Sequence, residues 1–588
     1  MTAKAPSAAA PVLSVRGLTV AVHGRPLVEG LTFDLAPGET LAIAGESGSG
    51  KSITSLAIMG LLPPQVRAAA GQILLDGRDL LTLPEAAMRG IRGDRIAMIF
   101  QEPMTSLNPV MTVGAQLVEA ITAHDPLSRG QARARALAAL QSVRISQPER
   151  RMGQYPHELS GGMRQRVMIA MALALKPDVL ICDEPTTALD VTVQREVLDL
   201  LRDLQRETGT ALILITHDMG VVAEMATRVI VMRAGEVVET GPVARIFAAP
   251  QAQYTRDLLA AVPRMGDGRG GVAVARAAPA ARLLDVSVAF DIRGGLMQRV
   301  THRVHAVEHV SLDILPGETF ALVGESGCGK STIARALVGL VPHQGHVEVA
   351  GQALSGLTAQ GRRAICREVQ MVFQDPMAAL DPRMTVGDLV AEPLVIHGIG
   401  TPAERRARVT DLFDRVGLPR DAADRYPHEF SGGQRQRICI ARALALRPKL
   451  IICDESVSAL DVSVQARVLS LLAELKRDLG LSFLFISHDM AVVENIADRV
   501  GVMYLGQIVE TGTRAQIFGN PQHPYTRRLI AAVPVPDPTH RRAPSARLSG
   551  EVPSPIHPAG QGPVRVDLRD IGGGHLVATP ENPVETAA

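Results

Sequence analysis

At 588 residues, the chain exceeds the length that a single hydrophobic core usually supports, so we expect two or more domains. The 61 Lys and Arg residues are balanced by 60 Asp and Glu residues, which excludes the basic excess of a dedicated nucleic-acid-binding protein. No apolar run reaches the roughly 18 residues of a membrane span, and the five cysteines lack the paired spacing of zinc sites. If the protein acts at a membrane, we expect a partner to supply the membrane-spanning part.

An internal repeat organises the chain. SGGMRQR begins at Ser160 and SGGQRQR begins at Ser431, a separation of 431 − 160 = 271 residues, and other shared motifs downstream keep this register. Upstream the separation is larger, because Lys51 and Lys330 are 330 − 51 = 279 residues apart. The second copy therefore carries extra residues before this point, which we expect in a surface loop beginning at Asp291.

The repeat predicts two domains, over residues 12–262 and 282–534. Residues 263–281 between them are rich in Gly, Ala, Arg and Pro, which is typical of a flexible linker. Residues 1–11 form an N-terminal extension. Residues 535–588 are punctuated by Pro and Gly, and we expect a C-terminal extension that is extended or partly disordered.

Each copy contains a glycine-rich loop between an apolar strand and a segment with helical periodicity, in TLAIAGESGSGKS and TFALVGESGCGKS. The glycines let backbone N–H groups point at phosphate oxygens, and the helix N-terminus adds its positive dipole end. We expect the lysine to reach the β- and γ-phosphates of a nucleotide and the serine after it to bind Mg²⁺. The predicted nucleotide-binding residues are Gly45, Glu46, Ser47, Gly48, Ser49, Gly50, Lys51 and Ser52 in the first copy and Gly324, Glu325, Ser326, Gly327, Cys328, Gly329, Lys330 and Ser331 in the second.

Two further strands of each copy end in side chains suited to ATP hydrolysis. VLICDEP and LIICDES end in paired carboxylates, of which the first suits Mg²⁺ held through water and the second suits a general base that polarises the attacking water. The structural alternative is a carboxylate that caps the next turn. A histidine that directly follows a later apolar strand can reach the γ-phosphate and hold the base and water in line. The predicted catalytic residues are Glu184, His217, Glu455 and His488.

LSGGMRQR and FSGGQRQR resemble the signature sequence of ATP-binding cassette (ABC) proteins. IFQEP and VFQDP resemble the Q-loop of that family, and TALD and SALD resemble its D-loop. A Ser-Gly-Gly that opens a helix also offers a hydroxyl and bare backbone N–H groups to an anion. The resemblance covers nearly the whole chain. It implies two P-loop NTPase ABC nucleotide-binding domains in tandem, each an α/β core with an antiparallel β subdomain and a helical signature subdomain.

The resemblance also implies that the two cassettes dimerise head to tail within the chain, with ATP between the phosphate loop of one and the signature of the other. Site one would combine Lys51, Gln101, Asp183, Glu184 and His217 with Ser431, Gly432 and Gly433. Site two would combine Lys330, Gln374, Asp454, Glu455 and His488 with Ser160, Gly161 and Gly162. The expected Mg²⁺ ligands are Ser52, Gln101, Asp183, Ser331, Gln374 and Asp454. Since both sites keep the glutamate, the histidine and the signature, we expect both to hydrolyse ATP.

Adenine is expected to stack on an aromatic side chain before each phosphate loop. Phe290 fits that role in the second copy, with an ordinary core phenylalanine as the alternative. The equivalent stretch of the first copy offers only Val22 and His23, so the stacking partner at site one is left open.

The segments around both Q-loops, and NPQHPYTRRLIAAVP in the second copy, resemble ATPases of dipeptide, oligopeptide and nickel importers. The resemblance implies an ATP-hydrolysing subunit that energises import of di- or oligopeptides or related small solutes. Its partners would be two membrane permease subunits and a solute-binding protein, with no nucleic acid, and its place the cytoplasmic face of the inner membrane. Many members carry a tail cysteine cluster for an iron–sulfur centre; this tail has no cysteine, so we expect no cluster.

A soluble tandem-cassette translation factor acting on the ribosome is the alternative from another class. Such proteins usually join their cassettes by a long, charged helical linker suited to RNA contact, whereas residues 263–281 are short and glycine-rich. We therefore favour the importer. Peptide is the first expectation for the solute, followed by glutathione-like peptides, nickel complexes and opine-like compounds.

Overall fold

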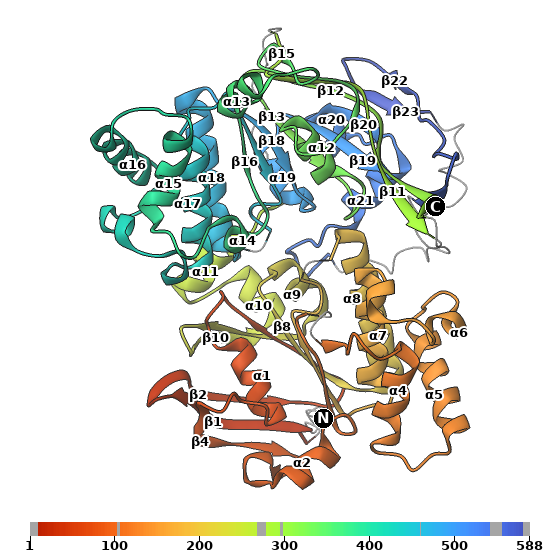
Figure 1. Ribbon diagram of the computed structural model, residues 1–588. Coiled ribbons are helices and arrows are strands. Elements are labelled where there is room, and N and C mark those ends of the chain that lie inside the picture. The colour runs from red at the N-terminus through yellow and green to blue at the C-terminus, as the bar shows by residue number, and fades with distance from the viewer. Residues whose placement is uncertain are drawn as a thin grey trace, which may run out of the picture.

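The computed structural model describes residues 10–102, 106–187, 189–266, 278–294, 298–458, 460–540 and 556–579. Most of the predicted N-terminal extension, the middle of the predicted linker, residues 295–297 of the extra stretch and much of the C-terminal extension lie outside the described residues. The two copies of the repeat form two similar cassettes, which occupy the lower and upper halves of Figure 1. We call residues 12–262 cassette 1 and residues 282–534 cassette 2.

Cassette 1 is built on two sheets. The antiparallel sheet has the strand order β2-β1-β4-β5 and consists of β1 (Leu13–Val22), β2 (Arg25–Leu35), β4 (Val66–Leu75) and β5 (Arg78–Asp79). The core sheet has the order β10-β9-β3-β8-β7-β6 and consists of β3 (Thr40–Ala44), β6 (Ile96–Ile99), β7 (Val179–Asp183), β8 (Ala211–Thr216), β9 (Arg228–Arg233) and β10 (Glu236–Pro242). All core strands are parallel except β10, which runs antiparallel at the edge.

The helices of cassette 1 fall into two groups. Those around the core sheet are α1 (Lys51–Met59), α2 (Glu85–Ile91), α8 (Val191–Thr208), α9 (Met219–Met225), α10 (Val243–Ala248) and α11 (Gln253–Ala261). A helical subdomain contains α4 (Val113–Thr122), α5 (Arg129–Ser142), α6 (Pro148–Arg151) and α7 (Gly161–Leu173). The short 3₁₀ turns are η1 (Leu80–Thr82) and η2 (Pro156–Glu158).

Cassette 2 repeats both sheets and enlarges them. Its antiparallel sheet has the order β15-β14-β11-β12-β21, with β11 (Ala281–Gly294), β12 (Arg299–Ile314), β14 (Gln344–Val349), β15 (Gln352–Ala353) and β21 (Ile556–Pro558). Its core sheet has the order β16-β17-β18-β13-β19-β20-β23-β22, with β13 (Thr319–Val323), β16 (Val369–Val372), β17 (Leu450–Asp454), β18 (Ser482–Ile486), β19 (Arg499–Tyr504), β20 (Gln507–Thr513), β22 (Leu568–Asp570) and β23 (Leu576–Ala578).

The helices of cassette 2 follow the same plan. Those around its core sheet are α12 (Lys330–Leu337), α13 (Ala359–Glu368), α18 (Val462–Leu479), α19 (Met490–Ile496), α20 (Arg514–Gly519) and α21 (Pro524–Ala532). Its helical subdomain contains α14 (Pro376–Ala379), α15 (Val386–Ile396), α16 (Pro402–Val416), α17 (Gly432–Leu444) and the 3₁₀ turns η3 (Arg420–Asp424) and η4 (Pro427–Glu429). The two helical subdomains lie on opposite sides of Figure 1, as a head-to-tail arrangement requires.

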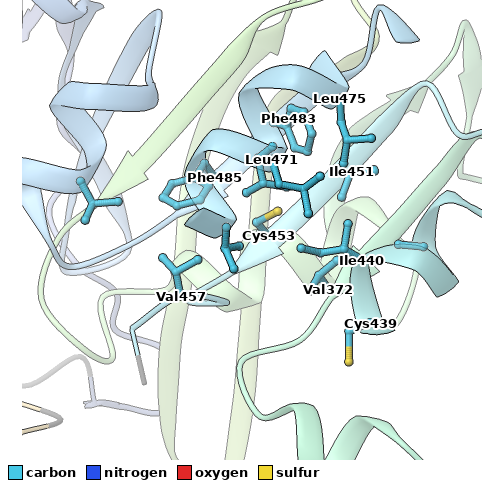
Figure 2. Close-up of a cluster of buried hydrophobic side chains, with 14 of the residues drawn as sticks. Val372, Cys439, Ile440, Ile451, Cys453, Val457, Leu471, Leu475, Phe483 and Phe485 are labelled. Atoms are coloured by element: carbon cyan, nitrogen blue, oxygen red, sulfur yellow. The ribbon is translucent and has the colours of Figure 1, made fainter. Parts of the chain in front are cut away.

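Apolar core strands fix the position of the functional residues. β7 and β17 are buried along their whole length, as expected for parallel strands that are covered on both faces. Figure 2 shows Phe483 and Phe485 of β18 packed with Leu471 of α18 in the core of cassette 2. Because the strands are parallel, their carboxyl ends meet at one edge of the sheet. The polar residues that follow them are therefore brought together.

The extra residues of cassette 2 lie next to the C-terminal extension. The described extra residues of cassette 2 prolong β11 and β12, so a longer β-hairpin stands where the sequence predicted a loop. β21 of the C-terminal extension pairs with this hairpin, at His302 to Val304 of β12. β23 pairs with β20 at the edge of the core sheet, and β22 pairs with β23. The tail residues 556–579 are thus built into both sheets of cassette 2.

The two cassettes contact each other through helices as well as loops. α11 of cassette 1 packs against α18 of cassette 2, and α21 of cassette 2 packs against α8 of cassette 1. The backbone N–H of Gly266 also donates to the carboxylate of Glu494 at 2.8 Å. In the described part of the chain, no helix combines the length and the apolar character that crossing a membrane requires.

Candidate nucleotide-binding sites

The two phosphate loops depend on glycine at their first position. A Cβ on Gly45 would lie 2.2 Å from the carbonyl oxygen of Met232, and a Cβ on Gly324 would lie 2.1 Å from that of Met503. Only glycine therefore lets the loop pass this close to the neighbouring strand. α1 and α12 begin directly at the loop lysines, so each helix N-terminus faces its loop as an anion site requires.

The loop lysines point back into their own loops. Lys51 Nζ donates to the carbonyl oxygens of Gly45 and Glu46, each at 2.8 Å. Lys330 Nζ makes the same bonds to Gly324 at 2.7 Å and Glu325 at 3.0 Å. Burial lowers the pKa of Lys51, although nearby carboxylates oppose the effect.

A serine and an aspartate meet beside each loop. Ser52 Oγ donates to Asp183 Oδ1 at 3.0 Å, and Ser331 Oγ donates to Asp454 Oδ1 at 2.8 Å. Burial raises the pKa of Asp183 to about 6 and raises that of Asp454 in the same direction. A buried carboxylate of this kind is stabilised by a nearby cation.

The predicted general base of cassette 1 lies in a polar cluster. Gln101 Nε2 donates to Glu184 Oε2 at 2.8 Å, and His217 Nδ1 lies 3.2 Å from Glu184 Oε1. Glu184 has a φ of +47°, a left-handed conformation that is rare for a residue with a side chain. The surrounding structure therefore holds this carboxylate in a strained position, as is common at functional sites.

Cassette 2 builds the same cluster with slightly different spacing. Gln374 Nε2 donates to Glu455 Oε2 at 2.9 Å, and His488 Nδ1 lies 3.7 Å from the same oxygen. Glu455 also has a left-handed φ, of +46°. Lys330 Nζ lies 3.8 Å from the other carboxylate oxygen of Glu455. Sequence-distant segments thus bring base, histidine, Q-loop and phosphate loop together in both cassettes.

Each glutamate and its histidine shift each other's pKa. Burial disfavours ionised Glu184, but His217, together with Thr187 and Lys51, outweighs this effect and lowers the pKa of the glutamate. The nearby His488 side chain is the main cause that lowers the pKa of Glu455. Burial opposes the charged form of each histidine, yet the paired glutamate raises both histidine pKa values. Both glutamates are therefore carboxylates at neutral pH, the form that a general base needs.

Both signatures begin helices, as their sequences indicate. Ser160 and Ser431 are the N-cap residues of α7 and α17, and their hydroxyls accept backbone N–H groups at 3.3 and 3.4 Å. Both serines are exposed. Gly161 and Gly432 follow as the first helical residues, and the next glycine of each signature packs closely against the helix after the D-loop.

The D-loops join the two cassettes. Ser47 N donates to Asp461 Oδ1 at 2.7 Å, and Ser326 N donates to Asp190 Oδ1 at 2.6 Å. Each phosphate loop is thus bonded to the D-loop of the other cassette. The residues that follow the D-loops add two further bonds across the interface, Thr192 to Glu325 at 2.6 Å and Ser463 to Glu46.

Sequence reasoning assigned the D-loop motifs but gave no role to Asp190, Asp461, Thr192 or Ser463. The sequence feature that could have indicated a role is that these residues occupy equivalent positions in the two copies of the repeat. The predicted adenine partner, Phe290, lies on β11 opposite Val304 and is 44% exposed. It is therefore no core residue, and adenine stacking on it stays a prediction.

Comparisons with known proteins identify the family of the chain. The sequence profile described as ABC transporter matches residues 28–187 and 307–458, and that of the oligopeptide/dipeptide transporter C-terminal region matches residues 238–286 and 509–562. The chain is 52% identical to the glutathione import ATP-binding proteins GsiA of Escherichia coli (strain K12) and Shigella flexneri, over 97% of this chain and 97% of each relative. This chain belongs to the ABC transporter family.

Within that family, the chain is an ATP-hydrolysing subunit, and the relatives that it resembles are import ATP-binding proteins. The comparisons support the importer and give no support to the ribosomal alternative. A dimeric structure of the ATP-binding cassette MJ0796 is 29% identical, covers 39% of this chain and 98% of its own, and gives a TM-score of 0.36.

The cross-cassette bonds predict how the phosphate loops exchange amide hydrogen. Replacing both D-loop aspartates, Asp190→Ala with Asp461→Ala, should speed exchange at Ser47 and Ser326 by about tenfold, since a hydrogen bond to a charged group contributes about 1.5 kcal/mol or more. Hydrogen exchange followed by mass spectrometry would measure this. Asp178→Ala is the control, because Asp178 pairs with Arg95 at the opposite end of β7. Equal exchange in the double variant and the control would contradict the D-loop contacts.

Proposed function

We propose that this chain energises the uptake of glutathione or a closely similar small peptide. The observation that carries the proposal is its 52% identity, over nearly the full length of both chains, with glutathione import ATP-binding proteins. The partners would be two membrane permease subunits and a solute-binding protein, with this chain peripheral to the cytoplasmic face of the inner membrane. The family match to the C-terminal region of oligopeptide/dipeptide transporters supports a peptide-type solute.

We propose two composite ATP sites, each with residues of both cassettes. Lys51 and Lys330 would hold the β- and γ-phosphates, and the exposed signature of the opposite cassette would complete each grip. Glu184 and Glu455 would each accept a proton from the attacking water, while His217 and His488 would orient that water and the γ-phosphate. The position of each histidine beside its glutamate, at 3.2 Å in cassette 1 and 3.7 Å in cassette 2, supports this division of roles.

Mg²⁺ fits the oxygen donors beside each phosphate loop. Serine hydroxyl, aspartate and Q-loop glutamine are hard donors, and Mg²⁺ is commonly held by one or two protein oxygens plus phosphates and water. No group of three or more His, Cys, Asp or Glu side chains able to hold a metal occurs among the described residues. The cation would neutralise charge on the transferred phosphoryl group.

A gene-deletion strain tests the proposed function. Cells that lack this chain should lose uptake of radiolabelled glutathione, and the unaltered gene should restore it. The Glu184→Gln/Glu455→Gln double variant should be made at normal level but should not restore uptake. Glutathione uptake that is unchanged by the deletion, with loss of dipeptide or nickel uptake instead, would reject glutathione and identify the solute.

The double variant Glu184→Gln/Glu455→Gln should also separate ATP binding from hydrolysis. A carboxamide keeps the shape of the side chain but cannot accept the proton, so turnover should fall by about 10²-fold or more while ATP still binds. Phosphate release and equilibrium binding of labelled ATP measure the two steps. Glu196→Gln, which changes a glutamate paired with Arg166, is the matched control. Turnover within about twofold of the unaltered protein would rule out the two glutamates as bases.

A further inference from the structure

The C-terminal tail attaches to cassette 2 through a buried histidine. β23 pairs with β20 in the register Glu510↔Val577, which places His575 beside Glu510. His575 Nε2 lies 2.8 Å from Glu510 Oε1, and the two residues are 3% and 0% exposed. The ring fits here because Gly512 has no side chain; a Cβ at that position would lie 3.2 Å from His575 Cδ2.

The same carboxylate fixes the start of α21. Glu510 accepts the backbone N–H groups of Gln522 at 2.8 Å and His523 at 3.0 Å. His523 is the N-cap of α21, and its Nδ1 accepts the backbone N–H of Tyr525 at 3.2 Å. The position of α21 therefore depends on Glu510, which in turn bonds the tail.

α21 contacts the back of the second phosphate loop. The hydroxyl oxygen of Tyr525, a residue only 5% exposed, accepts the backbone N–H of Glu325 at 3.0 Å. Arg528, one turn further along α21, lies 3.6 Å from the Glu325 carboxylate. A continuous path of hydrogen bonds thus runs from His575 in the tail to the phosphate loop that carries Lys330.

Cassette 1 has the same path without the tail. Glu239, the counterpart of Glu510, accepts the backbone N–H groups of Gln251 at 2.9 Å and Ala252 at 3.1 Å. Tyr254 is only half-buried, and its bond to the backbone N–H of Glu46 is longer, at 3.4 Å. β10, which carries Glu239, is an edge strand of its sheet, whereas β20 is covered by β23.

We propose that His575 is a positioning residue for the ATP site that contains Lys330, and that the two ATP sites are inequivalent for this reason. The tail holds Glu510, Glu510 holds α21, and α21 holds the second phosphate loop. Without His575, a fully buried carboxylate loses one of its donors, so the junction between β20 and α21 rearranges. The inference rests on the proposed assignment of the phosphate loops.

The test measures ATP binding at each phosphate loop separately, in the full-length chain. The Glu184→Gln/Glu455→Gln background prevents ATP from being consumed. Adding Lys51→Ala leaves the second loop as the ATP-binding site, and adding Lys330→Ala leaves the first. In the Lys51→Ala protein, His575→Met should weaken binding of labelled MgATP roughly two- to tenfold, the effect of one hydrogen bond. Methionine fills the space of the histidine but offers no N–H donor. In the Lys330→Ala protein it should change binding by less than about 1.5-fold, since the hydrogen bonds from His575 lead directly to the second loop and reach cassette 1 only through the D-loop contacts.

His575→Gln is the conservative control, because its carboxamide keeps an N–H donor, and it should restore most of the lost affinity. Glu510→Gln combined with His575→Met should be non-additive, whereas Glu239→Gln combined with His575→Met should be additive. Equal weakening at both loops, no weakening at the second, or no recovery with glutamine would overturn the inference. Two binding sites remaining in the Lys51→Ala protein would instead overturn the loop assignment, and the inference with it.

Discussion

The arrangement of the two ATP sites depends on one interaction, the bond between each D-loop aspartate and the phosphate loop of the other cassette. Asp461 bonds Ser47 N and Asp190 bonds Ser326 N, so neither loop is shaped by its own cassette alone. Asp190 lies only six positions after Glu184, on the connection between β7 and α8. The predicted base of one site is therefore close in the chain to a residue that bonds the phosphate loop of the other, which gives the two sites a direct physical route for coupling.

Fusing the two cassettes allows them to differ. Two identical chains would make two identical interfaces, whereas here the helix pairs α11–α18 and α21–α8 have different sequences. Only cassette 2 carries the tail, which covers the edge of its core sheet and bonds Glu510. Glu184 and Glu455 have nearly the same left-handed φ, +47° and +46°, and both are partly buried. The two predicted catalytic centres are thus alike in these respects, and the structural difference lies behind the phosphate loops.

The strands and loops that carry the chemistry could be predicted from the sequence, because buried parallel strands are short apolar runs and their functional ends are marked by Gly, Asp, Glu and His. Strands β21 to β23 could not, since they are short, Pro- and Gly-flanked segments whose pairing depends on an edge supplied by distant residues. The cross-cassette role of Thr192 and Ser463 was hidden for a related reason. The hydrogen-bond partner of a single hydroxyl group after a motif cannot be predicted from the sequence, because it lies in a distant segment that only the fold brings close.

The proposal that each ATP site contains residues of both cassettes can be tested by a crosslink. The chain already has Cys328 in the second phosphate loop, so Gly161→Cys, with the other four cysteines replaced, places a thiol in the signature of the opposite cassette. A disulfide requires Cβ atoms about 4 Å apart. If each site contains residues of both cassettes, ATP should promote efficient disulfide formation in this variant and not in the matched Gly432→Cys variant, whose signature belongs to the same cassette as Cys328. Efficient crosslinking to position 432 and none to position 161 would contradict it.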